Sequence, residues 1–179
     1  MLRLIDLARA CQQIKRFHGA SYSALNVLQH QWLTYYLAKD AGAPEIVQLA
    51  ALVHDLAEGV IGDLSYGAKL AYPSVRARLA RLEAKVLAEI VGPEVVAAID
   101  LVKPFDAHAA EIELAIMAME EPEAYLFVIE CNKAIVAGFD HEPIDPTDRD
   151  IDLYAMSVGS GLYGYVERVE SMLQTVEVS

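Results

Sequence analysis

A histidine followed directly by an aspartate, His54-Asp55, is the part of this sequence best suited to chemistry. The residues before it, among them Leu49, Ala50 and Val53, are apolar at helical spacing, so the pair ends a helix that we expect to be buried. A buried imidazole beside a buried carboxylate is costly unless both are paired or bind a cation. Adjacent residues on a helix point about 100° apart, so both side chains could bind one divalent ion.

Two further acids follow this pair closely. Glu58 is one helical turn beyond His54 and Asp55, near the same face, and Asp63 follows Gly62 in an expected flexible turn. An acid and a water-orienting base beside a metal are the groups that hydrolysis needs. A chance His-Asp pair at a helix end is the alternative, and the two acids favour a metal site over it. We therefore expect Glu58 and Asp63 to be catalytic.

A second histidine lies upstream in a strongly apolar segment. His30 belongs to a helix that we expect over residues 26–41, with Asn26 as its N-cap. A lone histidine in such a helix is usually a core residue with a hydrogen-bond partner. Because a candidate metal pair exists at His54 and Asp55, we interpret His30 as a further ligand.

Three segments together resemble HD-domain nucleotide phosphohydrolases. They are Arg16-Phe17-His18, then Asn-Val-x-x-His ending at His30, then His54-Asp55-x-x-Glu58-x-x-x-Gly62-Asp63-Leu64. The pattern is most similar to that of the YfbR-like 5′-deoxynucleotidases and of the compact phage-type HD hydrolases, which include deoxynucleoside triphosphohydrolases. The resemblance covers roughly residues 3–120.

The resemblance implies a fourth protein ligand. Relatives take a last aspartate from a motif of the form Leu-Val-Lys-x-x-Asp, which corresponds here to residues 101–106, so Asp106 would join the two histidines and Asp55. Asn132 is a competing placement, because family members often carry Asp-Lys on an apolar helix of this kind. A neutral amide makes a poor metal ligand, and Asp106 is the better fit.

The resemblance also assigns residues to the substrate. Arg16 corresponds to the phosphate-binding arginine of the family, whose guanidinium can hold a phosphate through two parallel hydrogen bonds. Lys69 and Lys103 lie near the two acidic motifs, at places suited to a polyphosphate, although solvated surface lysines are the alternative for each. Phe17, where the deoxynucleotidases carry Trp, is expected to line the sugar and base.

The activity that the resemblance implies is metal-dependent hydrolysis of phosphate from a (deoxy)nucleotide. Two imidazoles and two carboxylates suit one divalent transition metal, with Mn, Co, Fe, Zn and Ni all allowed. A triphosphohydrolase that releases triphosphate or pyrophosphate remains open, as does a catalytically silent module that binds nucleotide. The presence of Glu58 and Asp63 argues against a silent module. An oxygenase would require ligands for a second iron, and no further histidine has a suitable spacing.

The elements that must position these residues are predicted to be helices throughout. Apolar residues recur at helical spacing, with proline and glycine between the segments. We expect helices over residues 2–14, 26–41, 44–58, 76–91, 94–103, 105–119, 122–137 and 150–174, with loops over 59–67 and 139–148. This predicts an all-α fold, and the resemblance implies that it is an HD-domain helical bundle. We expect one domain over 1–179, with the metal site in 1–120 and further helices in 121–179.

Composition narrows the partners and the compartment. The net charge of −12 disfavours bulk nucleic acid, yet a small phosphorylated nucleotide could still bind beside a metal and local cations. The apolar runs are too short to span a membrane. Cys11 and Cys131 form no metal or redox motif and are expected to be core thiols in a cytoplasmic protein. A homodimer is also expected, since the apolar fraction of 55% is high for so acidic a chain.

Overall fold

The computed structural model describes residues 2–22, 25–64 and 66–176, and its regular elements in these ranges are helices. The β-type pairing among the described residues is an isolated bridge between Lys15 and Asn26. The prediction of an all-α fold is therefore confirmed. In chain order the elements are α1 (Leu4–Gln13), η1 (Arg16–Gly19), α2 (Val27–Asp40), α3 (Glu45–Val53), α4 (Glu58–Ile61), α5 (Tyr66–Ala71), α6 (Pro73–Val91), α7 (Pro93–Ala98), η2 (Ile99–Leu101), α8 (Lys103–Glu120), α9 (Pro122–Ile135), α10 (Asp148–Gly159) and α11 (Leu162–Val176).

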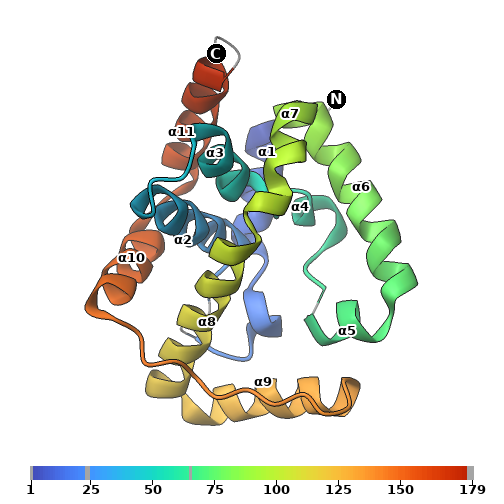
Figure 1. Ribbon diagram of the computed structural model, residues 1–179, viewed down its shortest axis with the longest axis vertical. Helices are drawn as coiled ribbons and strands as arrows, with labels where there is room; N and C mark the ends of the chain where they lie inside the picture. The colour runs from blue at the N-terminus through green and yellow to red at the C-terminus, as the bar shows by residue number, and fades with distance from the viewer. Residues whose placement is uncertain (1, 23–24, 65, 177–179) are drawn as a thin grey trace.

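Helix α2 lies at the centre of the bundle. It packs against α1, α3, α8 and α10 (Figure 1). Asn26 caps its N-terminus, as predicted: the Asn26 side chain accepts from the Gln29 backbone N–H, and the Gln29 side chain accepts from the Asn26 N–H. This reciprocal pair satisfies two donors that the helix itself cannot. Because α2 is covered on most sides, it can hold a polar residue such as His30 fully out of water.

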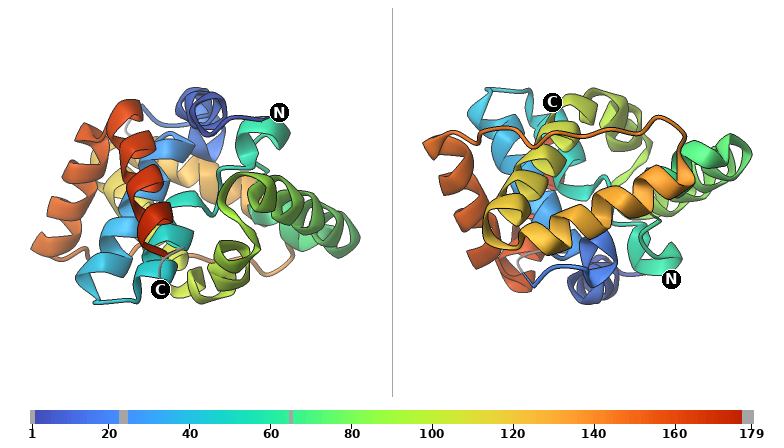
Figure 2. Two further views of the ribbon diagram at one scale, coloured as in Figure 1. Left: turned by 90° about the horizontal axis from the view of Figure 1, so that it is seen from above. Right: turned by 90° about the horizontal axis from the view of Figure 1, so that it is seen from below.

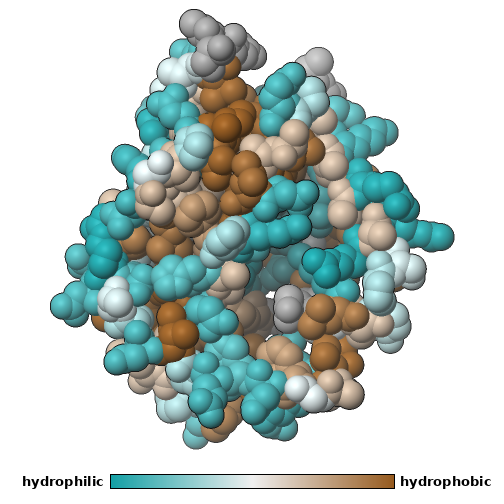
Figure 3. Space-filling model, in the orientation of Figure 1, coloured by the Kyte–Doolittle hydropathy of each residue, from teal (hydrophilic) through white to brown (hydrophobic). Residues whose placement is uncertain are grey.

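Helices α5 and α6 form an arm beside the bundle. The long helix α6 is joined to it by α7 at one end, and α5 rests on α9 at the other (Figures 1 and 2). Near the C-terminus, α11 packs on α1 and α3, and apolar surface gathers over this region (Figure 3). Within the described residues no helix combines the length and apolarity needed to cross a membrane.

The loop predicted over residues 59–67 is only partly correct: residues 62–64 have no regular structure, but the short helices α4 and α5 occupy the two ends of this segment. Helix α4 packs tightly on α1: a Cβ atom added at Gly59 would lie 2.8 Å from the Leu7 carbonyl oxygen. The absence of a side chain at Gly59 thus lets the two backbones approach. This tertiary contact, rather than local periodicity, holds the α4 turn.

Two predicted helices are also divided. The helix predicted over residues 150–174 is broken at Ser160, whose extended backbone separates α10 from α11. The helix predicted over residues 94–103 ends at Ala98 and continues as a 3-10 turn. Pro104 lies in the first turn of α8, where its missing N–H costs little. The expectation for the cysteines holds for buried Cys11 and is wrong for Cys131, which is exposed on α9.

Candidate metal centre

Helix α3 brings His54 and Asp55 to the centre of the molecule from its C-terminal end. Residues 49–53 at the end of α3 are all buried, which fixes the position of this end. The Nδ1 atom of His54 lies 2.7 Å from the Ala51 carbonyl oxygen. A carbonyl oxygen can only accept, so Nδ1 carries a proton and donates it there. The Nε2 atom of neutral His54 is therefore the one with a free lone pair.

Helix α2 contributes His30, which is fully buried. Its Nδ1 lies 2.9 Å from a carboxylate oxygen of Glu113, and its Nε2 lies 3.0 Å from Oδ1 of Asp106. The two imidazole rings meet edge to face, with their centroids 5.4 Å apart. Both Nε2 atoms thus point toward the first turn of α8, where Asp106 lies.

The side chains of His30, His54 and Asp106 each offer a ligand atom, and these atoms lie within 4.8 Å of one another. This group could hold a metal ion. The Oδ2 atom of Asp55 lies beside it, 3.3 Å from His54 Nε2 and 3.9 Å from His30 Nε2. The structure therefore brings together all four residues that were predicted as ligands.

The polar atoms of this group fit a divalent cation. His54 Nε2 is buried and has no hydrogen-bond partner among the described residues, which is costly for a polar atom. Burial acts to lower the pKa of His54, but the Asp55 and Asp106 carboxylates outweigh it and raise that pKa well above its ordinary value. Burial likewise acts to raise the pKa of Asp106, but the hydrogen bond to His30 and the nearby His54 ring hold that pKa below its usual range. Surroundings that favour positive charge between these groups also favour a bound cation.

Glu58 lies at the start of α4, and its side chain is 3% exposed. Burial, together with the charges of Asp55 and Asp63, raises the pKa of Glu58 to about 9, although Lys69 opposes this shift with its Nζ 3.3 Å from Oε1. A carboxyl group whose pKa is raised in this way is suited to hold a proton near neutral pH. Asp63 is half-buried after Gly62, whose φ of 86° favours glycine.

Arg16 lies at the edge of this group, with its side chain 13% exposed. Its Nε lies 3.0 Å from Oε2 of Glu113, and its Nη1 lies 3.7 Å from Oδ2 of Asp55. The next residue, Phe17, has a φ of 51°, a left-handed backbone that is uncommon outside glycine. The Phe17 ring is half-buried against the cluster of α8 and α9 residues that includes Met117, and the Arg16 guanidinium lies 5.5 Å from its centroid.

Of the two lysines predicted to bind substrate, the structure brings one to this group. Lys69 contacts Glu58, whereas Lys103 is 69% exposed and its Nζ lies 2.7 Å from Asp100. Asn132, the competing candidate for the fourth ligand, lies on α9. Its Oδ1 accepts a hydrogen bond from the Gly67 backbone N–H at 3.1 Å. This hydrogen bond links α5 to α9.

Glu113 is the residue of this region that the sequence analysis missed. It lies two turns after Asp106 on α8 and hence on the same face of that helix. The sequence does place an acid on the apolar face of this helix, seven residues after a candidate ligand, and that spacing could have indicated Glu113.

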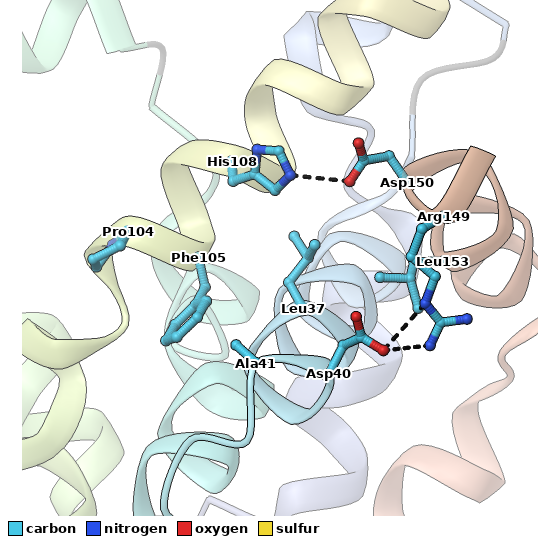
Figure 4. A pocket seen from close by; sticks show the side chains of 9 residues that line it. All are labelled: Leu37, Asp40, Ala41, Pro104, Phe105, His108, Arg149, Asp150 and Leu153. Carbon is cyan, nitrogen blue, oxygen red and sulfur yellow. Dashed lines mark hydrogen bonds and ion pairs between the residues drawn. The ribbon is translucent and has the colours of Figure 1, made fainter. Parts of the chain in front are cut away.

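A separate groove of about 370 Å³ lies between α2, α8 and α10 (Figure 4). Phe105 and His108 line it, whereas Asp106, between them in sequence, reaches the histidines of the metal group. The polar side chains of the groove are paired across it, Arg149 with Asp40 and His108 with Asp150. The groove therefore does not belong to the candidate metal centre.

No protein-family model matches this sequence, and no curated protein matches it. The geometry of the candidate metal centre and the motifs that form it are therefore the features that point to a function.

Proposed function

We propose that this chain is a metal-dependent phosphohydrolase of the HD type, which releases phosphate from a (deoxy)nucleotide. One observation carries the proposal. A buried group of His30, His54 and Asp106 that could hold a metal lies close to Asp55. The charge of Asp55 in turn helps to raise the pKa of the buried Glu58. A metal group without an acid would suit a structural site equally well, and the protonated carboxyl is what favours hydrolysis.

The four predicted ligands would hold one divalent transition metal, which when bound polarises a phosphate and lowers the pKa of a water. Contacts within the chain already orient the two histidines for this role. Hydrogen bonds to Ala51 and Glu113 place the protons of His54 and His30 on Nδ1, so that each Nε2 can act as a ligand atom.

Glu58 and Asp63 would divide the proton transfers. The protonated Glu58 can give its proton to the leaving oxygen of the nucleotide. Asp63 can orient the attacking water. The turn at Gly62 leaves Asp63 close enough to Glu58 for its charge to raise the pKa of Glu58. Two carboxyl groups with different surroundings are the usual arrangement for an acid and a base in one site.

Arg16 and Lys69 would bind the phosphate. The Nε atom of Arg16 is engaged by Glu113, so its terminal Nη groups are the part of the guanidinium left to contact phosphate oxygens. Lys103, which was expected to bind a polyphosphate, is instead paired with Asp100 away from this group. We therefore favour release of a single phosphate over release of triphosphate or pyrophosphate.

The test is an assay for phosphate, pyrophosphate and triphosphate on a panel of nucleotides, with Mn²⁺, Co²⁺ or Zn²⁺ added. We expect phosphate release from at least one nucleoside monophosphate. Glu58→Gln should retain the metal and lower the rate about 10²–10⁴-fold. Glu89→Gln, an exposed acid on α6, is the matched control and should leave the rate unchanged. A metal-loaded wild-type protein that hydrolyses none of these nucleotides would instead favour the silent nucleotide-binding module.

A further inference from the structure

Glu113 contacts both halves of the candidate site at once. Its side chain is 1% exposed, on the face of α8 that meets α2 and η1. Its Oε2 lies 2.9 Å from His30 Nδ1 and 3.0 Å from Arg16 Nε, and its Oε1 lies 3.1 Å from the same Nε. One buried carboxylate therefore joins a candidate metal ligand to a candidate phosphate-binding arginine.

On the metal side, Glu113 decides how His30 presents itself. A carboxylate oxygen accepts hydrogen bonds, so the contact with Glu113 places the proton of neutral His30 on Nδ1. The lone pair on Nε2 then faces Asp106, 3.0 Å away. Carboxylates that hold a ligating histidine in this way commonly contribute 10–100-fold to metal affinity, as an order of magnitude.

On the phosphate side, Glu113 decides how Arg16 is oriented. A guanidinium is planar, so a hydrogen bond at Nε, close to the end of the alkyl chain, restricts the direction of both Nη groups. The Nη1 atom lies 3.7 Å from Oδ2 of Asp55. Arg16 in turn supplies the positive charge that a carboxylate as buried as Glu113 requires.

We propose that Glu113 is a positioning residue that couples metal binding at His30 to phosphate binding at Arg16. This inference rests on the proposed function, because it takes a metal and a phosphate as the two ligands of the site. Coupling of this kind is reciprocal, so phosphate should tighten metal binding by the factor by which metal tightens phosphate binding. Loss of Glu113 should weaken both and should reduce the coupling between them.

The experiment compares the full-length wild type with Glu113→Gln, a variant of nearly the same shape without the charge. Co²⁺ affinity and the visible absorption of bound Co²⁺ are measured first, and inorganic phosphate binding is then measured by calorimetry with and without Co²⁺. We expect the Co²⁺ Kd of Glu113→Gln to rise about 10–100-fold, with a changed absorption spectrum. Phosphate binding should weaken as well, and its dependence on Co²⁺ should shrink.

Glu111→Gln is the matched control, because Glu111 lies on the same helix and is also paired with a histidine, His141. It should leave Co²⁺ and phosphate binding unchanged. Glu113→Asp, which keeps the charge on a shorter side chain, serves if Glu113→Gln does not fold, and we expect a smaller loss of Co²⁺ affinity from it.

Three results would overturn the inference or separate it from the proposed function. Unchanged Co²⁺ affinity and spectrum in a folded Glu113 variant with a lowered Tm would make the ion pair purely structural. A wild type that binds no Co²⁺ would also overturn it. If Glu113→Gln weakens Co²⁺ and phosphate binding but the wild type hydrolyses no nucleotide, the proposed function is refuted and the inference stands.

Discussion

His54 Nδ1 lies 2.7 Å from the carbonyl oxygen of Ala51, one turn earlier in the chain, and this contact determines which nitrogen of His54 faces the acids. The bond is local, so it forms with the end of α3 itself. The free Nε2 then lies 3.3 Å from Asp55 and 3.6 Å from Asp106. This local hydrogen bond thus orients the His54 side chain so that its Nε2 faces both carboxylates.

Asp106 should be required for metal binding, and Asn132 should not. Asp106→Asn removes a charge 3.0 Å from His30 Nε2, whereas Asn132 contacts Gly67 and the Val128 carbonyl. Elemental analysis after loading with Zn²⁺ should show near-complete loss of metal for Asp106→Asn and full occupancy for Asn132→Ala. The opposite pattern would place the fourth ligand at Asn132.

Metal affinity should increase with pH. The pKa values of His30 and His54 are raised, since burial lowers them but the surrounding carboxylates more than compensate. A metal must then displace the protons that these imidazoles hold below their raised pKa values. Co²⁺ titrations between about pH 6 and about pH 9 should show affinity rising by up to tenfold per pH unit for each proton displaced, as an order of magnitude. Affinity independent of pH over this range would refute the shift.

Glu58 should cost stability at high pH. Its pKa in the folded protein is about 9, against an ordinary value of 4.5, so the stability present below pH 4.5 is lost as the pH rises toward 9. Glu58→Gln cannot ionise and escapes this loss. In EDTA at about pH 8 its Tm should exceed that of the wild type by at least about 2–4 °C, the change expected from roughly 1 kcal/mol in a chain of this size. The difference should shrink near pH 4.5, and a constant difference would contradict the assignment.

Gly59 should not tolerate a side chain. Gly59→Ala would place a Cβ 2.8 Å from the Leu7 backbone oxygen and push α4 away from α1, at a cost of about 1–3 kcal/mol. Gly164→Ala is the control, because nothing lies within 4 Å of an added Cβ in α11 and alanine favours helix. Thermal unfolding should show a lower Tm for the first variant and an unchanged or higher Tm for the second. Equal effects would mean that the α1–α4 approach is not tight.

The helical nature of the chain and its candidate ligands could be predicted from the sequence. Apolar periodicity is a local property, and it indicated α1, α2, α3, α6, α8 and α9 within a few residues of their observed bounds. His54, Asp55 and Glu58 lie within two turns, so their spacing alone places them near one another. The motifs that resemble HD enzymes then indicated His30 and Asp106 on other helices.

Only the tertiary structure determined how the rest of the site is arranged. Glu113 meets His30 and Arg16 from 83 and 97 positions away in the chain, and no local pattern specifies which turn of α8 faces α2. Lys103 and Lys69 both lie near an acidic motif in the sequence, yet one pairs with Asp100 at the surface and the other contacts Glu58. Such outcomes depend on how whole helices pack, because a rotation of α8 or a shift of α5 would exchange the buried and the exposed side chains without changing any local propensity.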